Sequence, residues 1–403
     1  MSPKSVFIQL FSLNLLNYID RQILFSVFPL IKADLALSDA QLGVLASAFM
    51  FVYMIAAPLV GFIADRTPRQ YAVSVCAFLW SVATMLSGAA KNYLHLFAAR
   101  SFIGIGEAGF TSVSPSFLAE RFPPEKRARI LAAFGLALPA GSALGYLLGG
   151  FLGLHFGWRS AFFIVGLPGA FAAAYAAFKL KDQRPVITKE EKPSLLSYLN
   201  LLNNKPFLFV CLAQAMGTFT LGALAAWMPT YMHRYYNFSV AQAGTVFGVL
   251  TITAGAAGTF LGGFLADKLL KKTKKAYYII SAASFTAALP FGLAAASYGN
   301  FKISLALFAL AIMLVFMQTG PLNAAIVKLT DVKIRSMAFA VNIFIIHALG
   351  DAISPALLGK ASDLFSLKTA VAAAMLFVLP AALFCAAAAK ADNTANSDFK
   401  IKS

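Results

Sequence analysis

The chain has 403 residues, of which 60% are hydrophobic and only 12% are charged. So few charges cannot cover the apolar surface of a soluble protein of this size, and the composition therefore predicts an integral membrane protein. The net charge of +17 lies mainly in short loops between apolar runs. Basic residues in such loops set topology and meet anionic lipid headgroups, so we expect membrane lipids and no nucleic acid as partners.

Apolar segments long enough to cross a bilayer recur along the whole chain. They lie at about 6–31, 41–64, 71–90, 93–118, 128–153 and 157–180, then at about 206–233, 239–266, 276–298, 301–329, 333–360 and 365–389. An even number of crossings places both termini on the same side. We therefore predict an all-α membrane protein with 12 transmembrane helices.

Lysine and arginine concentrate in alternate loops. One set of loops holds Arg66, Arg69, Arg121, Lys126, Arg127, Arg129, Lys268, Lys271, Lys272, Lys274, Lys275, Lys328, Lys333 and Arg335, together with the stretch from Lys179 to Lys205. The opposite loops hold only Lys32, Lys91, Arg159, Arg234, Lys302, Lys360 and Lys368. The positive-inside rule therefore predicts a multi-pass protein with both termini in the cytosol.

The stretch from Lys179 to Lys205 is the longest polar connection, and it falls near the middle of the chain. Its position predicts two halves joined through a linker at the membrane surface. The predicted parts are an N-terminal six-helix bundle at 1–180, a cytosolic linker at 181–205, a C-terminal six-helix bundle at 206–390 and a cytosolic tail at 391–403.

The two halves also repeat. The run Gly61-Phe62-Ile63-Ala64-Asp65-Arg66 returns as Gly263-Phe264-Leu265-Ala266-Asp267-Lys268 at an offset of 202 residues. A basic entry to the fifth span at Arg127 has a counterpart at Arg335 before the eleventh, at an offset of 208. Parallel six-span repeats predict two pseudo-symmetric bundles and a secondary transporter whose substrate site lies between them.

The first span contains an unusual polar stretch from Asn14 to Arg21. Asn14, Asn17 and Tyr18 precede an adjacent acid and base, Asp20 and Arg21. Such groups are costly against lipid and are tolerated where they face a bundle interior or a wet cavity, where they usually mark a transport path. We therefore predict that this stretch lines a cavity.

The fourth span provides partners for that stretch. At about 1.5 Å per residue, Asp20 lies roughly 20 Å from the cytosolic end of its helix, and Arg100 lies roughly 10 Å from the outer end of an oppositely directed one. Glu107 follows Arg100 by seven residues and shares its helical face, with Thr111 one turn further on. A buried carboxylate titrates according to whether an arginine is near, as proton coupling requires. The alternative is a fixed ion pair that orients the helices.

The second half offers further polar residues in its spans. His347 and Asp351 stand four residues apart in the eleventh span and can touch on one helical face. Histidine titrates near neutral pH, so this pair is a second candidate proton site, although a structural hydrogen bond explains it equally well. The other candidate cavity residues of this half are Gln214, Thr218, Trp227, Gln318, Asn323 and Asn342.

The loop at Gly61–Arg69 resembles the G-x-x-x-D-R-x-G-R signature of the major facilitator superfamily. The resemblance implies a gate at the cytosolic mouth, and the residues assigned to it are Gly61, Asp65, Arg66 and Arg69, with Gly263 and Asp267 from the repeat. Two positions depart from the signature, Pro68 where glycine is usual and Gln70 where a base is common. The alternative is a charged loop that only fixes topology.

No sequence motif indicates a cofactor or a metal. The chain lacks a G-x-x-x-x-G-K-[ST] loop and an H-E-x-x-H motif, and its four histidines are dispersed. Its three cysteines, Cys76, Cys211 and Cys385, lie far apart in apolar runs, as small core residues do. We expect no cofactor, no bound metal and no ATP-driven transport by this chain.

Several stretches together resemble the Spinster-type transporters of the major facilitator superfamily. They are 14–21 in the first span, 100–108 in the fourth, 141–146 in the fifth, 157–159 before the sixth, 227–229 in the seventh and 347–355 in the eleventh. The resemblance implies the major facilitator fold and a proton-linked carrier of lysophospholipids or sphingoid lipids. It also implies that Asp20, Arg21, Arg100 and Glu107 take part in coupling. We expect protons and a lysolipid or other small molecule as partners, a monomer, and a bacterial inner membrane as location.

The leading hypothesis is therefore a secondary transporter that uses alternating access, is coupled to protons and moves an amphipathic organic molecule. A second hypothesis is a proton-coupled permease for a small organic anion, whose carboxylate Arg21 and Arg100 would hold. A third is an intramembrane enzyme acting on lipids with Glu107 or His347 as base, which the half-repeat argues against. We expect that the chain is not an enzyme.

Overall fold

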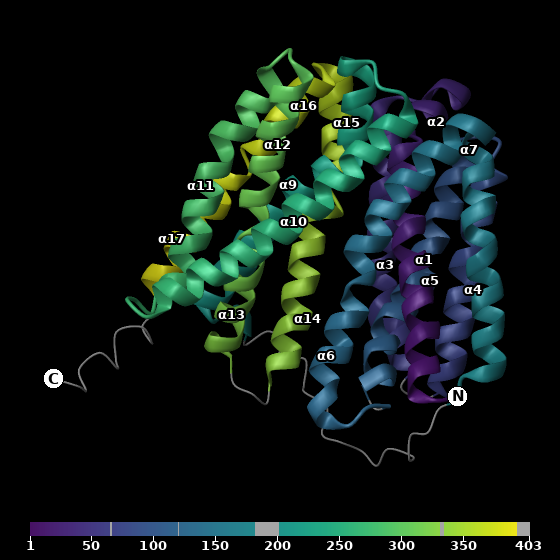
Figure 1. The fold of residues 1–403 in the computed structure, drawn as a ribbon, viewed down its shortest axis with the longest axis horizontal. Coiled ribbons are helices and arrows are strands. Elements are labelled where there is room, and N and C mark those ends of the chain that lie inside the picture. Colours follow the sequence, from purple (N-terminus) through teal and green to yellow (C-terminus); the bar gives the residue numbers. More distant parts are fainter. Residues whose placement is uncertain (65–66, 120, 182–200, 331–333, 393–403) are drawn as a thin grey trace. The chain divides into compact units, whose positions relative to one another are not determined.

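The computed structural model describes residues 1–64, 67–119, 121–181, 201–330 and 334–392 (Figure 1). All regular structure in these ranges is helical. Most of the predicted linker at 181–205, most of the predicted tail at 391–403, and Asp65 and Arg66 of the predicted gate lie outside the described residues.

The first half of the chain forms the helices of six crossings. They are α1 (Pro3–Ser26) with α2 (Phe28–Leu35), α3 (Asp39–Ala64), α4 (Arg69–Gly88), α5 (Tyr93–Ala119), and α6 (Pro124–Gly135) with α7 (Ala137–Lys179), which together form the fifth and sixth crossings. The long helix α7 contains two crossings, because Gly157 has φ 79° and ψ 155° and breaks it. Positive φ of this size strains residues with a side chain, so glycine suits the turn. The fifth and sixth predicted spans are thus separate, as expected.

The second half supplies six more crossings. They are α9 (Lys205–Tyr236), α10 (Val240–Leu270), α11 (Ala276–Ser297), α12 (Phe301–Phe316) with α13 (Thr319–Leu329), α14 (Arg335–Ile346) with η2 (His347–Asp351) and α15 (Ser354–Leu364), and α16 (Leu367–Met375) with α17 (Val378–Ala391). Within the described residues, nine helical stretches are long and apolar enough by themselves to span a membrane. The predicted all-α fold with 12 transmembrane helices is confirmed.

Tertiary contacts divide the chain into two compact units. Unit 1 comprises Met1–Ile187, Ala225–Ile252 and Pro355–Asp363, and unit 2 comprises Thr188–Leu224, Thr253–Ser354 and Leu364–Ser403. Unit 1 therefore contains the first-half helices together with parts of α9, α10 and α15. We call the end of unit 1 opposite the N-terminus its outer end, where α2 and the start of α3 lie (Figure 1).

Glycines let α7 pack closely on α1. A Cβ atom at Gly141 would lie 2.7 Å from the Tyr18 Cβ atom, and one at Gly145 would lie 2.7 Å from the Ile19 carbonyl oxygen. Small residues four apart on one helix face are typical of close helix packing in membranes. A second close approach joins α5 and α4, where a Cβ atom at Gly106 would lie 2.7 Å from the main-chain nitrogen of Trp80. These approaches bring the polar stretch of α1 within reach of α4 and α5.

We predict that Gly145→Val destabilises the protein by about 1–3 kcal/mol, because an added side chain in a packed interface forces the backbones apart. The measurement is the thermal unfolding midpoint of the detergent-solubilised protein, which should fall. Gly135→Ala is the control, because no heavy atom outside its local chain lies within 4 Å of a Cβ atom there. Equal midpoints for the two variants would contradict the packing role of Gly145.

Candidate functional site

A buried ion pair joins α1 and α5. The Arg21 Nε atom donates a hydrogen bond to the Glu107 Oε2 atom. The Glu107 side chain is fully buried, whereas 16% of the Arg21 side chain is exposed. The other carboxylate oxygen of Glu107, Oε1, has no hydrogen-bond partner. The acid of the fourth span and the base of the first span are thus in direct contact.

Asp20 lies beside this pair, and its carboxylate contacts a hydroxyl group. Thr84 of α4 donates a hydrogen bond from Oγ1 to Asp20 Oδ2 at 3.1 Å, while Asp20 Oδ1 has no partner. Arg100 donates from Nη1 to the main-chain carbonyl of Asp20 at 3.5 Å, and its Nε atom has no hydrogen-bond partner. Both Asp20 and Arg100 are 1% exposed. The predicted cluster of Asp20, Arg21, Arg100 and Glu107 is therefore assembled, with Arg100 on the Asp20 backbone.

Aromatic rings surround the arginines. The Arg21 guanidinium carbon lies 5.2 Å from the ring centre of Tyr18, 4.9 Å from that of Phe49 and 5.3 Å from that of Tyr53. Phe49 also lies 5.7 Å from the guanidinium carbon of Arg100. Ring faces attract cations at these distances, so the rings of α3 stabilise two buried positive charges. Phe49 and Tyr53 were not predicted from the sequence, because aromatic residues in membrane spans are common.

The remaining first-half candidates differ in their contacts. The Asn14 side chain donates to the main-chain carbonyl of Phe134 at 3.3 Å. The Asn17 amide lies near the Glu107 carboxylate but not in hydrogen-bonding geometry, and neither of its polar atoms has a partner. The Thr111 hydroxyl donates to the Glu107 carbonyl at 2.9 Å. Asn17 is thus the candidate that faces the ion pair.

The second-half pair lies at a break in its helix. His347 Nδ1 and Asp351 Oδ1 are 2.8 Å apart, and each side chain is 23% exposed. They belong to the π-helical turn η2, in which Gly350 departs from helical geometry with φ −108° and ψ −107°. A Cβ atom at Gly350 would lie 3.0 Å from the Ala215 carbonyl oxygen and from the Thr218 Cβ atom of α9. Single π-helical turns inside membrane helices are frequent at functional sites.

Amide side chains of unit 2 lie along α9, α13 and α14. Gln214 donates from Nε2 to Asn323 Oδ1 at 3.1 Å. The side-chain oxygens of Gln214, Gln318 and Asn342 are buried and have no hydrogen-bond partner. Buried amide oxygens without hydrogen-bond partners are costly, so these three oxygens stay candidates for a polar site.

Trp227 does not belong to this amide group. Its indole nitrogen donates to the Pro355 carbonyl at 3.0 Å, and its ring packs 5.4 Å from the ring of Phe28. It is fully buried in unit 1. The contacts of Trp227 are therefore those of a packing residue.

The gate residues that the structure describes are few. Arg69 begins α4, is 4% exposed, and places its guanidinium carbon 5.2 Å from the ring centre of Phe117. Gly61 lies in α3, whereas Gly263 and the exposed Asp267 lie in α10. A Cβ atom at Gly263 would meet no heavy atom within 4 Å. The gating role of these residues stays a prediction.

A cluster at the outer end of unit 1 was missed by the sequence analysis. Asp39 accepts hydrogen bonds from both Arg234 Nη atoms, from Lys32 Nζ and from Ser362 Oγ, each at 2.5 Å. Asp363 accepts from the first main-chain N–H groups of α3 at 2.9 Å and 2.7 Å. We call these five residues the outer cluster. Arg234 and Ser362 are 195 and 323 residues away from Asp39, so no local pattern could reveal it.

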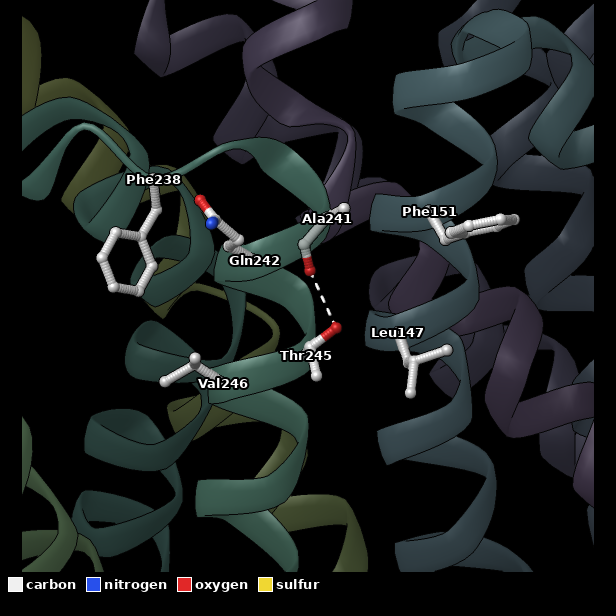
Figure 2. A pocket seen from close by; sticks show the side chains of 7 residues that line it. All are labelled: Leu147, Phe151, Phe238, Ala241, Gln242, Thr245 and Val246. Carbon is white, nitrogen blue, oxygen red and sulfur yellow. Dashed lines mark hydrogen bonds between the residues drawn. The ribbon is translucent and has the colours of Figure 1, made fainter.

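An apolar groove of about 500 Å³ lies between α7 and the start of α10 in unit 1. Figure 2 shows its lining, which is formed by Leu147, Phe151, Phe238, Ala241, Gln242, Thr245 and Val246. The Thr245 hydroxyl is turned back to the Ala241 carbonyl at 2.9 Å, which leaves the groove wall largely apolar.

Comparisons with known proteins agree with this architecture. The model of the Major Facilitator Superfamily matches residues 10–355. The chain is 28% identical to the "Probable sphingolipid transporter spinster homolog 2" of Arabidopsis thaliana, over 94% of this chain and 86% of that protein. It is 30% identical to "Protein spinster homolog 1" of Xenopus tropicalis, over 89% of this chain and 73% of that protein.

A solved structure shows the same fold. It is the crystal structure of a bacterial homolog to the human lysosomal transporter Spinster, in an inward-facing and unoccupied conformation. The TM-score is 0.86 at 22% identity, and the match covers 96% of this chain and 97% of the other. The predicted major facilitator fold is confirmed.

Twelve membrane helices with a charged cluster enclosed by the first six define a membrane transporter, and the chain belongs to the major facilitator superfamily. Within that superfamily it is a Spinster-type transporter. The predicted family is thus confirmed. The relatives are transporters, so the expectation that the chain is not an enzyme is also confirmed, and the third hypothesis is set aside.

We predict that Arg234→Ala increases the population in which α3 and α9 separate at the outer end by about tenfold or more, because a charge-assisted hydrogen bond contributes about 1.5–3 kcal/mol. The measurement is the distance distribution between spin labels at Val44 and Tyr235, both exposed. Lys302→Ala, which removes an exposed base elsewhere, is the control. An unchanged distribution would show that the outer cluster does not hold these helices together.

Proposed function

We propose that the protein is a proton-coupled secondary transporter that moves an amphipathic lipid, such as a lysophospholipid or a sphingoid lipid, by alternating access. Membership of the Spinster family supports the substrate class, since an Arabidopsis relative is named a probable sphingolipid transporter. The observation that carries the coupling is the buried Arg21–Glu107 ion pair with the carboxyl group of Asp20 beside it.

Coupling follows from one arginine placed between two buried acids. While Glu107 is ionised, it holds Arg21, because leaving either charge buried and alone would cost about 3–5 kcal/mol. Protonation of Glu107 removes the charge that holds Arg21 and frees the arginine for Asp20, its neighbour in sequence. The protonation state of one acid thus sets the position of Arg21 and with it the contact between α1 and α5. Protonation can in this way change the stability of one conformation relative to the other.

The outer cluster supports alternating access within unit 1. The outer cluster joins the start of α3 to the outer parts of α9 and α15. It does so through four hydrogen bonds to Asp39 and two from main-chain N–H groups to Asp363. Opening that end requires these contacts to break together. The outer cluster therefore serves as the outer gate, and the loop after α3 with Gly61, Asp65, Arg66 and Arg69 serves as the cytosolic gate, with Gly263 and Asp267 as its counterpart.

An amphipathic substrate fits the chemistry of the described site. The Arg21, Arg100, Asp20 and Glu107 cluster offers charges for a head group, while the groove beside α7 offers apolar walls. In unit 2, His347 and Asp351 and, separately, the amide side chains are further candidates for polar contacts to a substrate.

One observation favours a second candidate, a proton-coupled permease for a small organic anion. The Nε atom of Arg100 is buried and has no hydrogen-bond partner, as a binding site for a carboxylate requires. A bidentate contact from this arginine to a substrate carboxylate would satisfy it.

The cellular setting follows from the charge distribution. We propose a monomer in a bacterial inner membrane with both termini in the cytosol, since lysine and arginine concentrate in the loops on the side of the N-terminus. Bundles at 1–180 and 206–390, joined by the linker at 181–205 and followed by the tail at 391–403, would then rock about the substrate.

We predict that Glu107→Gln abolishes flux driven by a pH gradient and leaves the protein folded, because glutamine keeps the shape of the side chain but cannot take up a proton. The measurement is flux into proteoliposomes with and without a pH gradient, together with the thermal unfolding midpoint. Glu125→Gln, a change of an acid at the start of α6, is the control. A variant that retains the pH dependence of the unchanged protein would refute the coupling role of Glu107.

The substrate class is tested by a flux screen of lysolipids and sphingoid bases against small organic anions, each with and without a pH gradient. We expect pH-driven flux of a lysolipid or a sphingoid base, with competition among such lipids. Arg100→Lys separates the two candidates further, because loss of a bidentate contact should weaken binding of an organic anion at least tenfold. Flux of organic anions without lipid competition would favour the permease.

A further inference from the structure

The third span, α4, faces the coupling cluster with two uncharged donors, and no part of the proposed function uses them. From this geometry we propose that Thr84 and Trp80 are positioning residues that hold the Asp20 carboxyl group in place in both of its protonation states. The proposal rests on the coupling role of Asp20 in the proposed function.

The direction of the Thr84 hydroxyl is the first observation. Serine and threonine in a helix commonly donate to the carbonyl one turn earlier, and two serines of α4 do so: Ser81 donates to Ala77 at 2.8 Å and Ser87 to Ala83 at 3.0 Å. Thr84, equally buried, instead donates to Asp20 Oδ2 on another helix at 3.1 Å. The Thr84 hydroxyl is thus available to Asp20 and is not bonded to a carbonyl of α4.

The indole of Trp80 is the second observation. Trp80 precedes Thr84 by four residues and so lies on the same face of α4. Its side chain is fully buried, and its N–H group lies near the Asp20 carboxyl but has no acceptor in hydrogen-bonding geometry. Asp20 Oδ1 is the oxygen that still lacks a donor. A small movement of the carboxyl therefore pairs the free N–H group with the free oxygen.

The indole is fixed by its neighbours. A Cβ atom at Gly106 of α5 would lie 2.7 Å from the Trp80 main-chain nitrogen and 2.9 Å from its Cβ atom. The ring of Phe110 packs edge-on against the indole, with ring centres 5.1 Å apart. These contacts limit the space around the indole, whose N–H group lies beside the Asp20 carboxyl.

The charges around Asp20 explain why neutral donors are needed. Glu107 and Arg100 act on it from α5, and Arg21 follows it on α1. Arg21 is engaged with Glu107, and Arg100 donates to the Asp20 main chain. From α7, glycines face this part of α1, and α4 adds the two uncharged donors. The carboxyl group of Asp20 thus depends on α4 while Arg21 is paired elsewhere.

The two donors differ in what they can do. A threonine hydroxyl can donate a hydrogen bond to a carboxylate, and it can rotate to accept one from a carboxylic acid. An indole N–H group can only donate. Thr84 therefore suits both protonation states of Asp20, and Trp80 favours the charged state. Together they keep the carboxyl group of Asp20 in one position while Arg21 exchanges between Glu107 and Asp20.

The test uses the full-length protein with Thr84→Val, which removes the hydroxyl and keeps the branched shape, and Thr84→Ser, which restores a hydroxyl. Thr84→Ala is measured beside them and decides the outcome if the valine variant does not fold. Ser87→Ala is the matched control, since it removes a buried hydroxyl of α4 that is bonded within its own helix. Trp80→Phe removes the indole N–H group.

The first readout is tryptophan emission against pH in detergent without substrate. The part of the titration that Asp20→Asn removes reports on the carboxyl group beside Trp80. Thr84→Val should move its midpoint to higher pH by about one unit, because the carboxylate loses a hydrogen bond that the neutral acid needs less. Thr84→Ser and Ser87→Ala should keep the original midpoint. A midpoint in Thr84→Val, or in Thr84→Ala where valine does not fold, equal to that of Ser87→Ala overturns the proposal.

The second readout is the pH profile of flux in proteoliposomes. Thr84→Val and Trp80→Phe should each move this profile to higher pH, with Thr84→Ser restoring it, and an unmoved profile in Thr84→Val overturns the role in transport. The two readouts also separate this proposal from the proposed function. If no lipid is transported, the proposed function fails, while the emission titration still decides whether α4 positions Asp20.

Discussion

The ion pair between Arg21 and Glu107 constrains the rest of unit 1. Two charges taken out of water are tolerated only in good geometry and with further polar contacts, so the helices that carry them must approach closely and stay in register. Glycines of α7 let α1 sit deep in the bundle, and Gly106 does the same for α5 against α4. Phe49 and Tyr53 of α3 then cover Arg21 with ring faces, which replace part of its lost hydration. Packing and electrostatics therefore depend on the same contacts.

The sequence repeat does not extend to the chemistry of the two halves. The first half gathers two acids and two arginines, whose charges balance. The second half has a histidine and aspartate at a π-helical turn, with amide oxygens that lack partners. Under the proposed function, this unequal distribution of charge would let one half respond to protons while the other supplies contacts to a polar head group. The sequence similarity at Gly61 and Gly263 belongs to the shared framework and not to this difference.

Patterns local in sequence predicted the framework, and contacts between distant residues were out of their reach. Runs of apolar residues gave the twelve spans, and helix rise alone placed Asp20 and Arg100 at similar depth, in agreement with the hydrogen bond from Arg100 to the Asp20 main chain. Depth does not give the partner of each side chain: Arg100 donates to the Asp20 main chain, and Thr84, which no sequence pattern singled out, donates to the Asp20 carboxylate. No sequence pattern singled out Asp39, because its partners Arg234 and Ser362 come from α9 and α15. Periodicity carries no information about such pairs.

The number of donors on each acid separates two kinds of charged cluster in unit 1. Both oxygens of Asp39 are occupied, by Arg234, Lys32 and Ser362, so that any movement there loses contacts. Asp20 and Glu107 each keep one buried oxygen without a partner, which costs about 1–3 kcal/mol per group. Such a deficit reduces the cost of leaving the present arrangement, because a rearranged site can supply the missing donor. A cluster whose carboxylate oxygens all have hydrogen-bond donors is therefore suited to holding one conformation. A cluster with oxygens that lack donors is suited to exchange between two.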